Sequence, residues 1–285
     1  MLPARLRLIA IDLDGTLLDS QGGLPARNRT ALHRAHEIGL KLVLCTGRSF
    51  TETRPVLGEI GLDLDATVTV GGALLSDART GRTFEATPFD SALAAELTRW
   101  LLDDGNTVLR IHDAFAAGYD GFAIGGRRRH PAVDRWIEKT PCAIREVSGL
   151  PFGAPPPLRI TVVDEGTRLR ELAGQVQSRY DGRVTFNVIE VRSLGFTVLE
   201  MFSAPVNKWF GIQKLAARWG IPRGEIAAVG DDVNDLPMIR EAGLGAAVGN
   251  AGDEVKLAAN VVLPRNDDCG VAMLIERIID SDTGA

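Results

Sequence analysis

Short apolar runs alternate with amphipathic stretches at the beginning of the chain. The runs are rich in leucine and β-branched residues, and they predict strands at 6–13, 41–46 and 66–70. After the first run, Pro25 opens a segment with apolar residues at helical spacing, which Gly39 ends. Ser49 and Glu52 form a capping box, which predicts the start of a second helix. Short apolar strands separated by helices are typical of a parallel sheet that is covered on both faces.

The same alternation returns in the last third of the chain. Apolar runs predict strands at 226–230, 245–249 and 260–264. Periodic segments around them predict helices at 205–219, 235–242, 253–259 and 271–280. Because strand–helix–strand units cross over with one hand, we expect both ends of the chain to build a single parallel sheet.

The middle of the chain has a looser pattern, in which apolar and polar residues alternate along several strands. These strands are predicted at 107–112, 158–164, 183–190 and 196–202. Asp90 is expected to cap a helix, and 79–83 favours a hairpin turn. The alternation indicates an antiparallel sheet with helices on one face. The predicted fold class is therefore α/β, with a Rossmann-like parallel sheet core from residues 1–84 and 193–285 and an inserted α/β cap domain at 85–192.

The composition adds few constraints, because it is that of an ordinary globular protein. The 285 residues carry a net charge of −5, which gives no sign of a nucleic-acid surface or an anionic membrane partner. Cys45, Cys142 and Cys269 lie far apart without CxxC spacing, which indicates neither a disulfide framework nor a zinc site. Asp12 ends the first apolar run too early for a signal peptide or a membrane span. The sequence predicts a soluble cytoplasmic protein and leaves its oligomeric state open.

Acidic side chains follow two of the predicted core strands. Asp12 and Asp14 come after the first strand, and Asp231 and Asp235 come after the strand at 226–230. The carboxyl ends of parallel strands share one edge of the sheet, where ligands bind. In an extended chain, Asp12 and Asp14 would point the same way. Two carboxylates ~4 Å apart repel by about 4 kcal/mol at an effective dielectric of about 20.

Two explanations can account for such an acidic edge. Either the carboxyl groups keep protons at a raised pKa, or a cation lies among them. An all-oxygen ligand set favours a hard cation, Mg²⁺ before Ca²⁺. A simpler interpretation is that Asp14 and Gly15 form a turn and that Asp12 caps a helix. The second acidic cluster at another strand end argues against that interpretation.

Two further segments could bind an anion at the same edge. Thr46, Gly47 and Arg48 offer a hydroxyl and backbone N–H groups at a helix start, although this is also common turn chemistry. Lys208 is expected near the beginning of a helix, where a cation opposes the helix dipole. It is either a solvated lysine or a partner for carboxylates and an anionic ligand.

Taken in order, these segments resemble the motifs of the haloacid dehalogenase-like hydrolases, and two later segments resemble the Cof-type subfamily of sugar-phosphate and cofactor-phosphate phosphatases. The matching segments are DLDGTLL (12–18), CTGR (45–48), Lys208, GDDVND (230–235), VGNA (248–251) and NDDCGVA (266–272). The resemblance implies a Mg²⁺-dependent phosphatase that hydrolyses a small phosphorylated metabolite, with a mixed α/β cap over the site.

The resemblance also implies roles for individual residues. Asp12 would be the nucleophile that forms an aspartyl-phosphate, and Asp14 would act first as a general acid and then as a general base. Thr46 and Lys208 would hold the phosphoryl oxygens. Gly47 and Arg48 belong to the same substrate-binding segment.

The implied Mg²⁺ site draws on both acidic clusters. Asp12, the backbone carbonyl of Asp14, and Asp231 would hold the ion. Asp235 would orient Lys208 and the groups around the ion without binding the ion directly. Asn234 would contact the phosphate or the same supporting groups.

The sequence departs from the family pattern at two positions and leaves one cluster unexplained. Gly71 stands where the family usually has Asn, and Cys269 stands where it usually has Asp. Both changes leave the catalytic groups in place but put the substrate assignment in doubt. The basic cluster Arg127 to Arg129 is either a solvated loop or a contact for a second anionic group of the substrate.

Two other functions fit parts of the pattern. A phosphotransferase or mutase would share the chemistry and pass the phosphoryl group to another acceptor. A non-catalytic phospho-receiver module would use an acidic cluster for signalling, but it needs only about one domain and no inserted cap.

Overall fold

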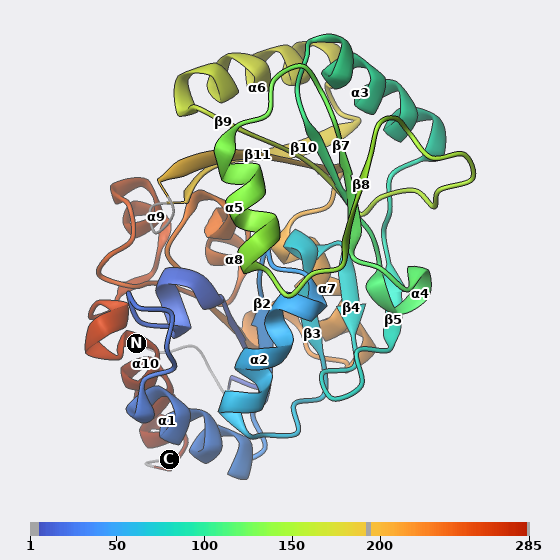
Figure 1. Cartoon of the computed structure of the whole chain (residues 1–285). Coiled ribbons are helices and arrows are strands. Elements are labelled where there is room, and N and C mark those ends of the chain that lie inside the picture. Colours follow the sequence, from blue (N-terminus) through green and yellow to red (C-terminus); the bar gives the residue numbers. More distant parts are fainter. Residues whose placement is uncertain (1–5, 192–194, 284–285) are drawn as a thin grey trace.

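Two sheets organise the chain in the computed structural model, which describes residues 6–191 and 195–283 (Figure 1). The strands of the eight-stranded sheet, in sheet order, are β14 (Val261–Val262), β13 (Leu244–Ala247), β12 (Ile226–Gly230), β1 (Leu8–Ile11), β2 (Lys41–Cys45), β3 (Thr67–Thr69), β4 (Leu74–Ser76) and β5 (Thr83–Ala86). The pairs from β14 to β3 are parallel, as predicted. The antiparallel strands β4 and β5 extend the sheet, and the predicted turn at 79–83 lies between them.

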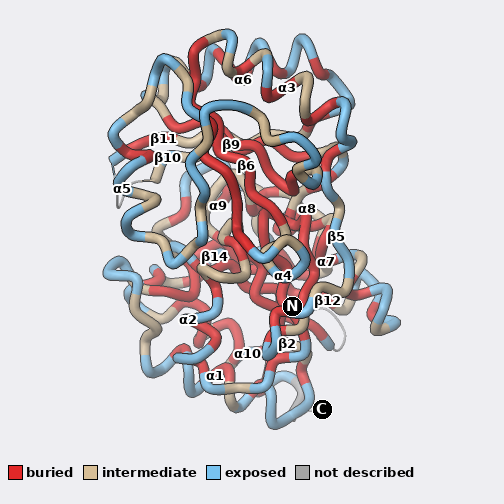
Figure 2. The backbone as a smooth tube through the Cα atoms, turned by 45° about the vertical axis from the view of Figure 1, so that its right-hand side comes forward, coloured by how far each residue is buried: buried red, intermediate tan, exposed pale blue. Residues whose placement is uncertain are grey.

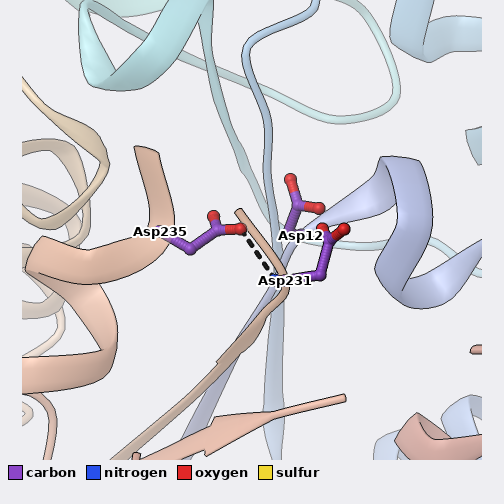
Figure 3. Close-up of side chains that lie close together, drawn as sticks. All are labelled: Asp12, Asp231 and Asp235. Carbon is purple, nitrogen blue, oxygen red and sulfur yellow. Dashed lines mark hydrogen bonds between the residues drawn. The ribbon is translucent and has the colours of Figure 1, made fainter. Parts of the chain in front are cut away.

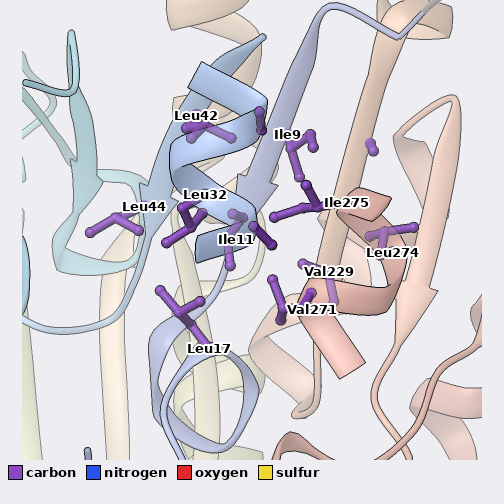
Figure 4. Close-up of a cluster of buried hydrophobic side chains, with 14 of the residues drawn as sticks. Ile9, Ile11, Leu17, Leu32, Leu42, Leu44, Val229, Val271, Leu274 and Ile275 are labelled. Carbon is purple, nitrogen blue, oxygen red and sulfur yellow. The ribbon is translucent and has the colours of Figure 1, made fainter. Parts of the chain in front are cut away.

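Helices cover both faces of this sheet. They are α1 (Ala26–Glu37), α2 (Phe50–Ile60), α7 (Lys208–Arg218), α8 (Leu236–Glu241), α9 (Asp253–Ala258) and α10 (Gly270–Thr283). Successive residues of β1 point to opposite faces, so Ile9 and Ile11 pack with α1, α2 and α10, while Leu8 and Ala10 pack with α7, α8 and α9. Figure 4 shows Ile9 and Ile11 among side chains of α1 and α10. This double cover explains why the strands are almost entirely apolar.

The six-stranded sheet is formed by the middle of the chain. Its strands, in sheet order, are β10 (Val184–Val191), β11 (Phe196–Ser203), β9 (Arg159–Asp164), β6 (Val108–Ile111), β7 (Gly121–Ile124) and β8 (Ile144–Val147). Its helices are α3 (Ser91–Asp103), α4 (Ala114–Ala117), α5 (Pro131–Lys139) and α6 (Gly166–Tyr180). The sheet is antiparallel except for the pair of β7 and β8.

The prediction of helices on only one face of this sheet is wrong. Helices α3 and α6 pack against Val108 and Val162 on one face. Helix α5 packs against Leu109 and Val163, which are the next residues along the same strands and therefore face the other way. Helix α5 is apolar along a single stripe, so its sequence pattern does not show which face of the sheet it covers.

The predicted N-terminal caps of two helices are confirmed. The Ser49 hydroxyl accepts from the backbone N–H of Glu52, and the Glu52 carboxylate accepts from the N–H of Ser49, which completes the capping box of α2. Asp90 accepts from the backbone N–H groups of Ala92 and Leu93 at the start of α3.

The extent of the inserted segment differs from the prediction. The predicted boundary at residues 192 and 193 lies outside the described residues. Strand β11 follows that boundary, yet it pairs with β9 and β10 in the six-stranded sheet. Strand β5 crosses the other predicted boundary, at 84 and 85, and pairs with β4 in the eight-stranded sheet. We therefore propose that the inserted domain lies between Ala86 and Ser203.

The two sheets meet through an apolar cluster. Val70, directly after β3, and Leu74 of β4 pack with Ile111 and Phe202 from the second sheet. Figure 2 shows buried residues along the strands in both parts and exposed residues on the outer turns of the helices. Within the described residues, five short helical turns connect the elements: η1 (Leu13–Leu17), η2 (Val70–Gly72), η3 (Arg223–Glu225), η4 (Val233–Asp235) and η5 (Asn266–Asp268). None of the described helices has the length and hydropathy needed to cross a bilayer.

Candidate active site

Three predicted site carboxylates converge at the carboxyl edge of the eight-stranded sheet. Asp12 follows β1, Asp231 follows β12, and Asp235 lies in η4 at the start of α8. One oxygen from each of the three lies within 4.8 Å of the others (Figure 3). Asp12 and Asp235 are buried, whereas Asp231 is partly exposed. The parallel pairing of β1 with β12 brings these residues together although they are more than two hundred positions apart.

Lys208 lies between two of these carboxylates. Its Nζ donates to Oδ1 of Asp12 at 2.6 Å and to Oδ1 of Asp235 at 2.5 Å, and its side chain is only 2% exposed. Asn207 caps α7 by accepting from the N–H of Phe210, which places Lys208 at the first position of the helix. The interpretation of Lys208 as a solvated lysine is therefore excluded.

The surrounding backbone holds the carboxylates closely. Oδ2 of Asp235 accepts from the N–H groups of Asp231 at 3.0 Å and Asp232 at 3.1 Å, so both oxygens of Asp235 are hydrogen-bonded. The hydroxyl of Thr16 donates to Oδ1 of Asp231 at 3.1 Å. Gly15 has a φ of +75°, and a Cβ added there would lie 2.5 Å from Oδ2 of Asp231. Only glycine satisfies both the backbone conformation and this close approach.

Burial and mutual repulsion change the acidity of this cluster. Burial first, and then the charge of Asp235, raise the pKa of Asp12 to about 7, although Lys208 opposes the rise. Burial, together with Asp12 and Asp235, raises the pKa of Asp231 to about 8. Burial lowers the pKa of Lys208, but the two carboxylates more than compensate and raise it overall. The cluster therefore contains more negative charge than its lysine can neutralise, and protons or a cation must balance the rest.

The predicted phosphate-binding segment lies next to this cluster. Thr46 and Gly47 follow β2, and Arg48 comes directly before the N-cap of α2. Thr46 is buried, and its Oγ1 accepts from the backbone N–H of Arg48 at 3.2 Å. A Cβ added to Gly47 would lie 4.0 Å from Nδ2 of Asn234, so η4 adjoins this segment. The structure thus brings the predicted substrate-binding residues to one edge.

Asp14 is oriented differently from Asp12, contrary to the expectation that both side chains point the same way. The carboxylate of Asp14 is 61% exposed and pairs with the Arg48 guanidinium, with an Nη2–Oδ1 distance of 2.5 Å and an Nε–Oδ2 distance of 2.8 Å. It is not part of the three-carboxylate group. Strand alternation does not extend to Asp14, because β1 ends at Ile11 and the chain then turns through η1.

Sequence reasoning missed two residues of the six-stranded sheet that reach this site. Nη1 of Arg159 donates to the backbone carbonyl of Gly47 at 2.6 Å and to Oε1 of Glu200 at 2.6 Å. Both side chains are almost completely buried. The available signal was a charged residue in each of two predicted strands, and it does not indicate what the charges contact.

The two departures from the family pattern have different surroundings. Gly71 has a φ of +63°, and a Cβ added there would lie 2.6 Å from Cζ of Phe202. The aromatic ring from β11 therefore lies beside this position, and a larger side chain at residue 71 would displace it. Cys269 has a φ of +58° and ends η5 directly before α10.

The basic cluster Arg127 to Arg129 is paired within the part of the chain that forms the six-stranded sheet. Arg127 donates to the backbone carbonyl of Asp103, Arg128 pairs with Asp104, and Arg129 pairs with Asp134 and Glu146. These contacts favour the interpretation of the cluster as a surface loop.

Comparison with known proteins gives consistent matches along nearly the whole chain. The sequence profile of haloacid dehalogenase-like hydrolases matches residues 9–275. The chain is 29% identical to pyridoxal phosphate phosphatase YbhA of Escherichia coli, over 94% of this chain and 97% of the relative. It is 28% identical to 5-amino-6-(5-phospho-D-ribitylamino)uracil phosphatase YwtE of Bacillus subtilis, over 96% and 98% of the two chains. A haloacid dehalogenase-like hydrolase from Bacteroides thetaiotaomicron has a similar structure, with a TM-score of 0.78, 27% identity, and coverage of 96% and 100%. The predicted fold class and family resemblance are confirmed.

Proposed function

Because the chain belongs to the haloacid dehalogenase-like hydrolase family, we propose that it is a Mg²⁺-dependent phosphatase that hydrolyses a small phosphorylated metabolite through an aspartyl-phosphate. One observation carries the proposal. Asp12 is buried against Lys208, with Asp231 and Asp235 beside it and the Thr46 segment at the same sheet edge. A nucleophilic carboxylate, a fixed cation and an acidic cluster are the groups that phosphoryl transfer requires.

The donor set fits Mg²⁺. It offers carboxylate oxygens without nitrogen or sulfur ligands, which suits a hard cation. The raised pKa values of Asp12 and Asp231 indicate uncompensated negative charge that a divalent cation would balance. Asp12, Asp231 and the backbone carbonyl of Asp14 would hold the ion, and Asp235 would fix their surroundings. When bound, Mg²⁺ supplies charge neutralisation for the phosphoryl group.

Asp12 is the proposed nucleophile. Its carboxylate oxygen forms a bond to phosphorus while the bond from phosphorus to the leaving oxygen breaks. Lys208 and the hydroxyl of Thr46 hold phosphoryl oxygens as negative charge is redistributed over them. Asp14 donates a proton to the leaving oxygen. It then accepts a proton from a water molecule whose oxygen attacks phosphorus, which releases phosphate and restores Asp12.

The pairing of Asp14 with Arg48 suggests how the acid becomes available. Arg48 holds the exposed Asp14 carboxylate through two hydrogen bonds. An incoming phosphate group is a competing anion for the same guanidinium. Binding of the substrate would therefore loosen the ion pair and release the Asp14 carboxyl group from Arg48.

The relatives support a substrate class rather than one compound. One is named for pyridoxal phosphate and another for a phosphorylated ribitylamino-uracil, and both substrates carry one phosphate on a small organic group. We propose a substrate of this kind, a cofactor phosphate, a cofactor-precursor phosphate or a sugar phosphate.

A screen of phosphorylated metabolites tests the proposed function. The purified protein with Mg²⁺ should release free phosphate from at least one phosphorylated sugar, pyridoxal phosphate or a related compound. EDTA should abolish the release, and added Mg²⁺ should restore it. Formation of a phosphorylated product instead of free phosphate would identify a phosphotransferase. Absence of phosphate release from all compounds, including p-nitrophenyl phosphate, would contradict the proposal.

A further inference from the structure

A buried ion pair of the six-stranded sheet reaches the phosphate-binding segment of the eight-stranded sheet. Arg159 opens β9, and Glu200 lies in the neighbouring strand β11. Their side chains are only 8% and 10% exposed. Nη1 of Arg159 donates both to Glu200 and to the backbone carbonyl of Gly47, each at 2.6 Å. The pair thus connects the two sheets, which also meet through the apolar cluster of Val70, Leu74, Ile111 and Phe202.

The carbonyl of Gly47 is the middle one of three consecutive carbonyls that are all fixed. The carbonyl of Thr46 accepts from the N–H of Gly71 at 3.0 Å, and that of Arg48 accepts from the N–H of Val70 at 2.8 Å. Both donors lie in η2, which follows β3 of the same eight-stranded sheet. The carbonyl of Gly47 is held by Arg159, from the inserted sheet.

Fixing this carbonyl also fixes the hydrogen bond that orients Thr46. The Gly47 carbonyl and the Arg48 N–H belong to one planar peptide unit and point in opposite directions. The Arg48 N–H donates to Oγ1 of Thr46. A hydroxyl that accepts a hydrogen bond on one side keeps its own proton free to donate on another side, and in the proposed mechanism that acceptor is a phosphoryl oxygen. Hydrogen bonds linked in this way strengthen one another.

We propose that Arg159, held in place by Glu200, is a positioning residue that orients the Thr46 hydroxyl for the phosphoryl group. This inference rests on the proposed function. The side chain acts through the Gly47 peptide and does not touch the substrate. Such a role accounts for a buried ion pair between two neighbouring strands, because buried pairs contribute little net stability compared with apolar side chains of similar size.

A double-mutant cycle tests whether Arg159 acts through Thr46. Arg159→Met keeps the unbranched apolar stem of the side chain and removes its donors, and Thr46→Val removes the hydroxyl while keeping the shape. We expect Arg159→Met to lower kcat/KM for p-nitrophenyl phosphate by about 10- to 100-fold in the wild-type background. In the Thr46→Val background, the same change should cost less than about threefold, because the group that it orients is already absent. Equal losses in both backgrounds would overturn the inference.

Two further variants separate positioning from loss of stability. Arg159→Met combined with Glu200→Leu removes both charges, which avoids an unpaired buried carboxylate, and it should show the same loss in kcat/KM as Arg159→Met alone. Arg168→Met is the matched control, because Arg168 pairs with Asp104 and Asp164 within the inserted part. It should leave kcat/KM within about twofold of the wild-type value. A loss equal to that of Arg159→Met would overturn the inference.

Binding of inorganic phosphate, measured by calorimetry, gives a readout that does not need turnover. Arg159→Met should weaken phosphate binding in the wild-type background and leave it nearly unchanged in the Thr46→Val background. If the wild-type protein hydrolyses no phosphate ester, the proposed function fails, and this binding cycle still decides the role of Arg159. If the wild-type protein is active but the cycle is additive, only the role of Arg159 fails.

Discussion

Two groups of ion pairs in this protein use the same kinds of side chain in opposite environments. At the edge of the eight-stranded sheet, Lys208 is 2% exposed and the side chain of Asp12 is 7% exposed. In the part that forms the six-stranded sheet, Arg129 pairs with Asp134 and Glu146, and these three side chains are between 28% and 58% exposed. Each group has a cation that contacts two carboxylates, so the difference between them is mainly burial.

The two environments shift carboxyl pKa values in opposite directions. Burial is the main reason that the pKa of Asp12 is raised to about 7, even though Lys208 contacts it. The hydrogen bond from Arg129 lowers the pKa of Asp134, which water solvates freely. The surface ion pair therefore keeps both of its charges. The buried cluster has an excess of negative charge, which a metal ion or a bound proton can neutralise. We attribute the proposed chemistry to this excess of negative charge in the buried cluster.

The largest expected effect is the loss of the nucleophile. Asp12→Asn should lower kcat/KM for p-nitrophenyl phosphate by about 1000-fold or more, because an amide cannot attack phosphorus. Asp134→Asn, in the exposed group, should leave kcat/KM within about twofold of the wild-type value. Steady-state kinetics with Mg²⁺ would check both variants, and circular dichroism would confirm folding. Substantial activity in Asp12→Asn would remove its assignment as nucleophile.

The second effect concerns stability and compares the two cations. Lys208→Met leaves Asp12 and Asp235 buried without their cation and should lower the free energy of unfolding by about 3–5 kcal/mol. Arg129→Met should change the unfolding midpoint very little, because its partners remain solvated. Urea unfolding in EDTA would measure both variants. Similar losses for the two would contradict the contrast between the buried and the exposed group.

The third effect is the pH dependence of the metal-free protein. The folded-state pKa values of Asp12 and Asp231, about 7 and about 8, lie above the ordinary value of 3.8. At pH values between 3.8 and about 8, the folded state binds protons that the unfolded state has lost, so the stability of the folded state should fall as the pH rises. Thermal unfolding in EDTA should give a Tm that decreases from pH 5.5 to 8.5.

Mg²⁺ and a charge-removing variant provide the controls for this pH effect. Saturating Mg²⁺ should raise the Tm most at the alkaline end, where the carboxylates are ionised and bind the ion. Asp231→Asn should flatten the decrease in EDTA. A Tm that rises between pH 5.5 and 8.5 without metal would show that the carboxyl pKa values are not raised.

The smallest effect compares two glycines with nearly equal backbone angles. Gly15 and Gly118 have φ values of +75° and +74°, but a Cβ meets Asp231 at the first position and nothing within 4 Å at the second. Gly118→Ala should cost only the left-handed strain of about 1–2 kcal/mol. Gly15→Ala should cost more and also weaken Mg²⁺ binding, which calorimetry would detect. Equal costs with unchanged metal affinity would contradict the close approach of Gly15 to Asp231.

The sequence determined those features that depend on near neighbours in the chain. The strand and helix pattern at both ends, the capping box at Ser49 and the cap at Asp90 follow from residues two to four positions apart. The family resemblance also came from short motifs read in order. Their meeting at one edge followed from a general rule, because the carboxyl ends of parallel strands share an edge.

The tertiary structure decided what those motifs contact. Asp14 turns to Arg48, helix α5 covers the second face of the inserted sheet, and Arg159 reaches the carbonyl of Gly47. Each of these contacts depends on how one part of the chain is placed against a distant part. The repeat of apolar and polar residues within one helix or strand does not predict that placement. The burial of Lys208, which changes the acidity of its partners, likewise exists only once both ends of the chain have formed one sheet.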